Sequence, residues 1–404
     1  MTTLCHLRKL VGLFIVVAFY LTPLRCLPAD DKAAVPTPHI TARNVQLAEG
    51  EPLKEVVDIL QAKTRAIIEW KPVVFDAGST AISDEEMRLV ALLPDLEILS
   101  LSSTRVTDEG IAFAARLTRL CELDLSGTSI TDKGMTYLKH LTTLRDLSLS
   151  ATRTTDFGLK QIEELHDLQT LRLDGTRITD AGVLSLKGMT NLRMLCLSHT
   201  AIGDNGLRSI GDFKRLKMLT LSHTLLTDNG VRELARLENL EWLELDDTNI
   251  SPTAISSLKV LPHLSRLSLR GTKADDVTLS ALADFPALLN LSLQATAVSD
   301  EGIKQLAHID SLENVSLDDT ALTDAGLRDL KAIGSLRSLS VSRTRVTAAG
   351  IDEFRRDRPS VSVVSFGIEG SDKAGSGGKS PHDNGAKSNM HDNKRQPPIP
   401  NFLK

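Results

Sequence analysis

Two histidines and an aspartate recur at a fixed interval in the middle of the chain. His199 and His223 are 24 residues apart, each within a Ser-His-Thr tripeptide, and Asp247 follows after a further 24 residues. Imidazole nitrogens and carboxylate oxygens are ligands of zinc and other transition metals, and the same groups transfer protons in catalysis. Whether these three side chains meet depends on the elements that carry them.

The interval of 24 residues runs through most of the sequence. Threonine occupies every 24th position from Thr80 to Thr344, and leucine every 24th position from Leu96 to Leu336, without a gap in either series. Self-similarity at a fixed period indicates a repeat protein, in which each period is one structural unit. A representative repeat reads LCELDLSGTSITDKGMTYLKHLTT, residues 120–143.

Each repeat predicts one strand and one helix. Leu123 and Leu125 alternate as in a short strand with one buried face. The apolar residues between 130 and 141 have the spacing of an amphipathic helix of two to three turns. Thr131 is a favoured N-cap residue, and Asp132 suits the positive end of the helix. One carboxylate per repeat does not supply the six oxygens of a calcium site, so the pattern favours helix capping over calcium binding.

Two other recurrent residues have expected structural roles. The threonine at position 128 of this repeat is expected to bond to backbone groups of the neighbouring turn. Gly134 is expected to let the start of the helix pack closely under the strand. Ala254 and Thr278 replace this glycine in two repeats, so local loosening is expected there.

A single repeat of this kind cannot bury its apolar face, and stacking of repeats buries it. The predicted fold is therefore an α/β solenoid, a horseshoe with about twelve parallel strands on the concave face and short helices on the convex face. The pattern LxxLxLxxTxITDxGL resembles the leucine-rich repeat family, in the class found in exported bacterial leucine-rich repeat proteins and in the repeat half of F-box receptors. The resemblance covers about residues 73–366 and implies a concave sheet that binds partners, usually proteins. Nothing resembling an F-box precedes these repeats, so a ubiquitin-ligase role is not carried over.

The chain is expected to have four parts. Residues 1–29 read as a signal peptide, 30–72 as a linker with a capping helix at 51–63, 73–366 as the solenoid and 367–404 as a disordered tail poor in apolar residues.

The signal is predicted from Arg8 and Lys9, followed by an apolar run of about twelve residues and a small-residue exit near Ala29. Because this run is shorter than the ~20 residues that span a membrane, we expect a cleaved signal and an exported protein, whether periplasmic, surface-bound or secreted. A chain anchored in the membrane by an uncleaved signal is the alternative.

Composition limits the classes of partner. The formal net charge is −5, and no basic stripe is visible along the repeats. Both observations argue against nucleic-acid binding. Aromatic residues make up only 3% of the chain, so the core is expected to be aliphatic.

The outward-facing strand positions of the middle repeats carry unusually large and charged side chains. Because adjacent parallel strands lie about 4.8 Å apart, Met194, Met218 and Trp242 are expected to form an apolar row, with the two histidines and Asp247 in a second row. Exposed Trp, Met and Arg beside charge are typical of binding surfaces. The predicted partner-binding residues are Met194, Cys196, His199, Met218, His223, Trp242, Glu244, Asp246, Asp247, Arg266 and Arg270.

Three functions fit these features. The first is a non-enzymatic recognition protein that binds a protein, or alternatively a glycan, through this surface and needs no cofactor. The second is a structural envelope or surface spacer without a dedicated ligand. The third is a metal-dependent hydrolase using His199, His223 and Asp247. The sequence lacks a nucleophile elbow, a phosphate-binding loop and a buried carboxylate pair, and the three candidate ligands would lie in a straight row on an open sheet. We therefore assign no catalytic residue and no metal ligand.

Overall fold

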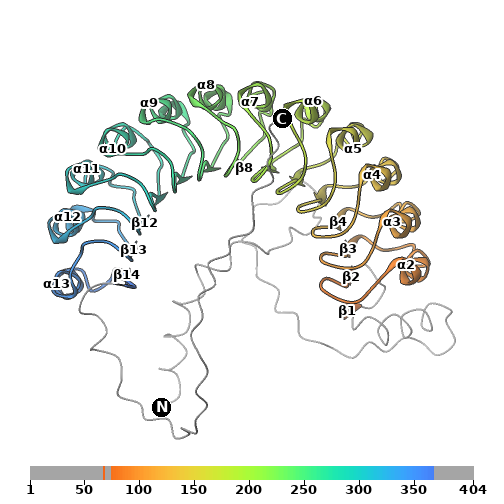
Figure 1. Ribbon diagram of the computed structural model, residues 1–404, viewed down its shortest axis with the longest axis horizontal. Helices are drawn as coiled ribbons and strands as arrows, with labels where there is room; N and C mark the ends of the chain where they lie inside the picture. Colours follow the sequence, from red (N-terminus) through yellow and green to blue (C-terminus); the bar gives the residue numbers. More distant parts are fainter. Residues whose placement is uncertain (1–66, 69–73, 368–404) are drawn as a thin grey trace, which may run out of the picture.

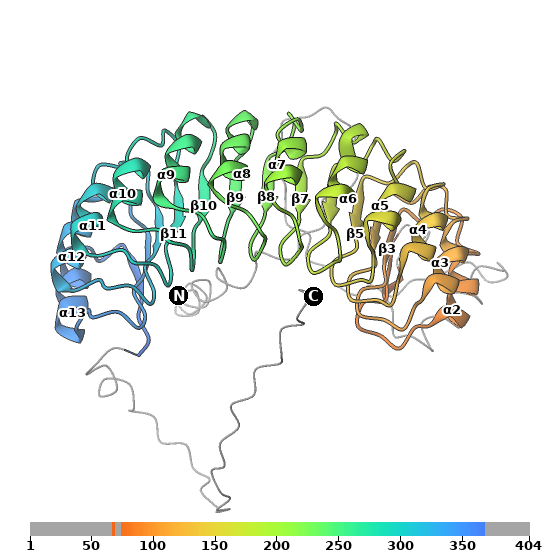
Figure 2. The same cartoon turned by 45° about the horizontal axis from the view of Figure 1, so that its top comes forward.

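The structure, a computed structural model, describes residues 67–68 and 74–367. The predicted signal peptide, the predicted capping helix and the predicted tail after Gly367 lie outside the described residues. The described part is a curved arch, with strands along its inner side and helices along its outer side (Figure 1). After a turn of 45°, the helices are seen stacked side by side along the outside of the arch (Figure 2).

One sheet of 14 strands follows the order of the sequence from β1 to β14. Strands β2 to β14 pair in parallel, each 24 residues from the next, and β1 pairs antiparallel to β2. The 13 parallel strands confirm the predicted α/β solenoid. The strands are β1 Ile67–Ile68, β2 Val74–Asp76, β3 Ile98–Ser100, β4 Glu122–Asp124, β5 Asp146–Ser148, β6 Thr170–Arg172, β7 Met194–Cys196, β8 Met218–Thr220, β9 Trp242–Glu244, β10 Arg266–Ser268, β11 Asn290–Ser292, β12 Asn314–Ser316, β13 Ser338–Ser340 and β14 Ser362–Val364.

Short helices connect the strands on the convex side. Most begin at an aspartate that follows a Thr or Ser N-cap, as the repeat pattern predicted. Four of them continue as a 3₁₀ turn. The helices are α2 Asp84–Val90, α3 Asp108–Ala114, α4 Asp132–Leu138, α5 Asp156–Gln161, α6 Asp180–Leu184, α7 Asp204–Ile210, α8 Asp228–Glu233, α9 Pro252–Ile255, α10 Asp276–Leu282, α11 Asp300–Leu306, α12 Asp324–Asp329 and α13 Ala348–Asp357.

The core is one continuous column of aliphatic side chains between sheet and helices. Leu195 and Leu197 of the β7 repeat are completely buried, as are their equivalents in nearly every other repeat. Removal of apolar surface from water is the main stabilising term, and each repeat obtains it only from its neighbours. In the part of the chain that the structure describes, no helix has the length and apolar character needed to cross a membrane.

The threonine series closes the turn of its own repeat. The Thr128 hydroxyl donates to the carbonyl of Leu125 at 2.6 Å, three residues earlier, and the same bond recurs for all twelve threonines. The expectation that this hydroxyl reaches the neighbouring turn is therefore wrong. The Thr128 side chain is buried, and its hydroxyl needs a hydrogen-bond partner. The nearby carbonyl of the same turn supplies that partner.

The aspartate series links one repeat to the next. One oxygen of Asp108 accepts the backbone N–H of Thr131 at 2.8 Å, and the other accepts its hydroxyl at 2.6 Å. Equivalent pairs of bonds join eight further junctions in the described residues, and a single bond joins Asp180 to Gly203. Hydrogen bonds to a charged group contribute about 1.5–3 kcal/mol each. We call this series the aspartate interlock.

The glycine series is explained by the interlock and not by close packing under the strand. A Cβ atom on Gly134 would lie 2.5 Å from Oδ1 of Asp108, which no real Cβ contact allows. At the one junction in the described residues where proline stands in place of the aspartate, at Pro252, the facing position 26 residues later is Thr278. There Asp275 caps its own helix through the N–H groups of Val277 and Thr278. At this junction the carboxylate and the glycine are lost together. At the preceding junction Ala254 stands in the glycine position and Asp228 keeps both bonds to Ser251, so a methyl group alone is accommodated there.

Candidate binding surface

The predicted apolar row exists on the concave face near the middle of the arch. Met194 pairs with Met218, and Met218 pairs with Trp242, in the parallel register of β7, β8 and β9. All three side chains are half-buried, whereas the leucines that follow each of them are fully buried. The row therefore belongs to the surface and not to the core.

Trp242 is held by two polar neighbours. Its indole N–H donates to Oε1 of Glu244 at 3.0 Å, and the guanidinium of Arg266 lies over the ring at 4.9 Å from its centre. Cation–π contacts of this kind contribute about 0.5–2 kcal/mol. The ring thus has a fixed orientation before any partner arrives, which lowers the entropic cost of using it as a contact.

The predicted row of His199, His223 and Asp247 is also brought together. The two imidazole rings stack with centres 4.3 Å apart and planes 18° apart, and Nε2 of His223 lies 3.1 Å from Oδ2 of Asp247. All three side chains are exposed. In the described residues, no group of three or more His, Cys, Asp or Glu side chains has an arrangement that could hold a metal ion.

These three residues lie in turns and not in strands, which differs from the sequence-based expectation. The strands end three positions earlier, and His199, His223 and Asp247 have φ values of 57°, 54° and 53°. The left-handed region is unfavourable for most residues and open to glycine. A signal was present in the sequence, because Gly127, Gly175, Gly271 and Gly367 occupy the same position of other repeats, with positive φ.

Three further predicted residues have unequal access to a partner. Cys196 is only 6% exposed, and burial, followed by repulsion from Asp174, raises the pKa of its thiol to about 12. Arg270 is exposed. Asp246 accepts hydrogen bonds from the Ser268 hydroxyl at 2.5 Å and from the backbone N–H of Arg270 at 3.0 Å. It therefore joins its own repeat to the next one, in addition to its predicted role in binding.

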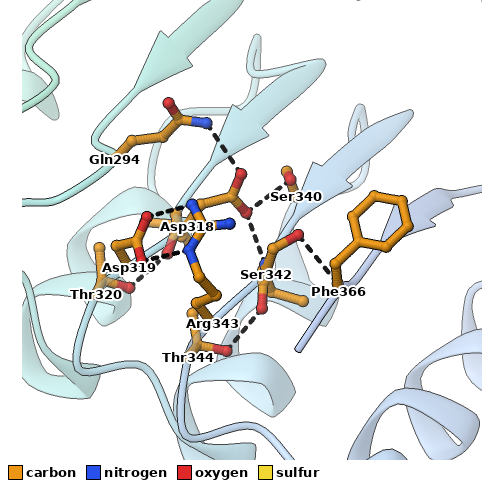
Figure 3. A network of polar contacts seen from close by, with 11 residues as sticks. Gln294, Asp318, Asp319, Thr320, Ser340, Ser342, Arg343, Thr344 and Phe366 are labelled. Carbon is orange, nitrogen blue, oxygen red and sulfur yellow. Dashed lines mark hydrogen bonds and ion pairs between the residues drawn. The ribbon is translucent and has the colours of Figure 1, made fainter. Parts of the chain in front are cut away.

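Sequence reasoning missed that Asp246 belongs to a series of period 72. Asp174, Asp246 and Asp318 each accept the backbone N–H of the residue 24 positions later, at 2.9, 3.0 and 2.6 Å. Figure 3 shows the third member, where Asp318 also accepts from Ser340 and Gln294. Beside it, Asp319 and Arg343 form a two-point ion pair. Three repeats, 72 residues apart, therefore close the end of their strand with a carboxylate.

The concave face contains two desolvated carboxyl groups, Glu122 and Glu244, whose pKa values are raised. Burial, followed by repulsion from Asp246, raises the pKa of Glu244 to about 7, although the bond from Trp242 opposes this. Burial, followed by repulsion from Asp146, likewise raises the pKa of Glu122 to about 7. One carboxylate oxygen of Glu122 is buried without a hydrogen-bond partner. Glu122 on β4 and Glu244 on β9 lie on the same face of the sheet, five strands apart, and only the three-dimensional packing reveals how far they are desolvated.

The Glu122 carboxyl should make the solenoid less stable at alkaline pH. Its pKa rises from 4.5 to about 7 on folding, so the stability from its protonated form is complete below pH 4.5 and is lost as the pH rises through 7. Glu122→Gln should therefore raise the melting temperature at pH 8 and leave it nearly unchanged at pH 5. Thermal melts at both pH values test this, with Glu109→Gln on the exposed side of α3 as the control. A gain of equal size at both pH values would contradict the assignment.

Parallel strands of three residues, short convex helices and a period of 24 define this chain as a solenoid repeat protein. Its repeats are leucine-rich repeats: residues 166–226 match one family description of the leucine rich repeat, and residues 93–113 and 120–139 match a second. These matches identify the repeats in the matched segments as leucine-rich repeats. Solenoids of this family commonly bind protein partners on their concave surface.

Solved structures support the fold assignment. An internalin (inlF) from Listeria monocytogenes shares 20% identity with a TM-score of 0.56, over 79% of this chain and 95% of that one. A structure described as a TDR receptor shares 15% identity with a TM-score of 0.51, over 78% of this chain and 58% of that one. At these identities the similarity establishes the fold alone. No curated protein sequence matches the chain.

Proposed function

We propose that this protein is a non-enzymatic recognition protein that binds a protein partner through the concave surface between β7 and β10. The observation that carries the proposal is the row of Met194, Met218 and Trp242, three large apolar side chains in strict register on the solvent-facing side of the sheet. Desolvation of such side chains by a partner is favourable, and tryptophan is enriched among the residues that dominate binding energy.

The surroundings of the row support recognition over a spacer role. Arg266, the stacked histidines and Asp247 surround it with charge, and Arg270 extends it towards β11. An apolar centre with a polar margin is the usual anatomy of a protein–protein interface. A glycan partner and a spacer without a ligand remain as the competing functions. Nothing in the described residues supports the metal-dependent hydrolase, since the two imidazole rings stack on each other.

A capture experiment tests the proposal against the spacer function. The full chain is immobilised beside a variant in which Met194→Ser and Met218→Ser remove the apolar row. The wild type should retain a protein that the variant loses, and both should melt at similar temperatures. Identical sets of retained proteins on both chains would contradict the proposal, and retention only of glycans would favour the alternative partner.

We also propose that the protein is exported, because residues 1–29 have the composition of a signal peptide. Cleavage should leave a mature chain that begins close to Asp30. N-terminal sequencing of the protein purified from the cell envelope and from the medium measures this directly. A mature chain that still begins at Met1 or Thr2 and stays with the membrane would support the uncleaved anchor.

A further inference from the structure

Between the apolar row and the stacked histidines, the concave face carries a strip of small side chains. Cys196, Thr220 and Ser222 are only 6%, 5% and 8% exposed, although they occupy outward positions of β7 and β8 and the turn that follows. The larger Met218, at the start of β8, and His223, in the turn after it, lie on either side of this strip. The strip is thus a row of small side chains flanked by larger ones.

Carboxyl groups lie at both ends of this strip. On the β6 side, Asp174 accepts a long hydrogen bond of 3.4 Å from the Thr220 hydroxyl. On the β9 side, Glu244 pairs in register with Thr220, and Asp246 follows two residues later. Asp174 and Glu244 both act electrostatically on the Cys196 thiol between them, so negative charge converges on the strip.

Ser222 has an unused hydroxyl within the strip. Its Oγ atom is buried and has no hydrogen-bond partner. In three other repeats the equivalent side chain bonds to the side chain 22 residues later; these pairs are Ser126 with Ser148, Asp246 with Ser268 and Asp318 with Ser340. For Ser222 that residue is Glu244, whose Oε1 atom accepts the indole N–H of Trp242 instead. A buried polar group without a partner is costly, and a bound ligand would supply the missing bond.

Positive charge near the strip does not neutralise it. Arg172 on β6 acts electrostatically on the Cys196 thiol, but its effect is smaller than that of burial and of Asp174. On β10, Arg266 lies over the Trp242 ring, and Arg270 is exposed. The pKa of Glu244 is about 7 because burial, Asp246 and Asp174 together disfavour its charged form. An added cation would relieve this repulsion.

We propose that the strip formed by Asp174, Cys196, Thr220, Ser222, Glu244 and Asp246 receives a cationic side chain, lysine or arginine, of the protein partner. The inference rests on the proposed function and adds the chemistry of the partner to it. The charged group donates hydrogen bonds to the Glu244 carboxylate and the Ser222 hydroxyl, and its alkyl stem lies along Met194 and Met218. Arg266 over Trp242 is an internal example of a cation held at the edge of this site.

Calorimetric titration of the full chain with an N-acetylated octalysine peptide tests the inference without the natural partner. Glu244→Gln should weaken binding about tenfold, and Ser222→Ala about threefold, as expected for loss of one partner of a charged hydrogen bond and of one neutral hydrogen bond. Glu301→Gln, on exposed α11, is the matched control and should bind as the wild type does. The same peptide with acetylated side chains should not bind. Equal affinities of Glu244→Gln and Glu301→Gln would overturn the inference.

Proton release gives a second readout that general charge attraction does not produce. At pH 7 the Glu244 carboxyl is about half protonated, since its pKa is about 7, and a bound cation favours the ionised form. Binding should therefore release about half a proton, measured as a difference in heat between phosphate and Tris buffers. The other titratable groups coupled to Glu244 are Asp246, Asp174 and the Cys196 thiol. Release that persists in Glu244→Gln would assign the proton to one of these and contradict the role of Glu244.

The outcomes separate this inference from the proposed function. A captured partner that depends on the apolar row but is insensitive to Glu244→Gln would leave the proposed function standing and overturn the cation site. Octalysine binding that depends on Glu244, in a chain that captures no protein, would leave the cation site standing and overturn the proposed function. Glutamine keeps the oxygen that accepts the Trp242 N–H, so a thermal melt close to that of the wild type is expected for the variant.

Discussion

Gly134→Thr should lower the free energy of unfolding by about 3 kcal/mol or more. The added Cβ would lie 2.5 Å from Oδ1 of Asp108 unless a group shifts. Asp228 keeps both bonds to Ser251 opposite Ala254, so the larger threonine side chain is needed to push the Asp108 carboxylate away from the N–H and the hydroxyl of Thr131. Loss of hydrogen bonds to a charged group costs about 1.5–3 kcal/mol each, and overpacking costs about 1–3 kcal/mol. Denaturant melts followed by circular dichroism measure the change.

The same substitution should cost almost nothing once the carboxylate is absent. Asp108→Ala alone breaks the interlock, and the double variant Asp108→Ala with Gly134→Thr should be no less stable than that single variant. The chain contains its own precedent, because Thr278 faces Pro252. A double-mutant cycle should therefore show a coupling energy of about 2 kcal/mol or more. Additive losses would mean that the glycine serves some purpose other than room for Asp108.

Trp242→Ala should weaken binding of the partner by about 2 kcal/mol, or about 30-fold, while the solenoid stays folded. The ring lies on the outer face of β9, and its removal also ends the contacts with Arg266 and Glu244. It leaves Leu243, the core residue of the strand, in place. A binding titration against the captured protein gives the change in affinity, and a melt run in parallel reports the fold.

Ser100→Ala on β3 is the control for this experiment, since it alters an outward position of the same sheet four or more strands away. It should leave the affinity unchanged. If Trp242→Ala behaved in the same way as Ser100→Ala, the binding surface would have to lie elsewhere on the molecule. A collapse of the melting temperature in Trp242→Ala alone would show that the ring supports the core.

The rows of the binding surface could be predicted because, in a solenoid, residues one sequence period apart lie side by side on neighbouring strands. Once Leu195 and Leu219 are assigned to the core, Met194 and Met218 must be neighbours one strand apart, and the structure pairs them. The same reasoning predicted that His199 and His223 lie side by side. It placed them on strands, because hydrophobic alternation does not show where backbone pairing stops and the turn begins.

The aspartate interlock escaped prediction because a local explanation was sufficient for the same residues. Thr131 followed by Asp132 reads as a helix cap, and Thr131 does cap its helix. The partner of each carboxylate lies 23 residues further along, in a repeat whose orientation the sequence does not specify. The paired change at Pro252 and Thr278 was the available signal. The raised pKa of Glu244 depends on its burial and on repulsion from Asp246 and Asp174, and no pattern in the sequence reports it.

The gap in the interlock has a mechanical consequence. A load applied to the two ends of the arch passes through every junction in series, so the junction with the fewest bonds yields first. In the described residues that junction lies between Pro252 and Asp275, where no carboxylate reaches across and α9 has only four residues. It follows directly after β9, which carries Trp242. Bending of the arch should therefore concentrate at this hinge, and the curvature offered to a partner would change most beside the tryptophan.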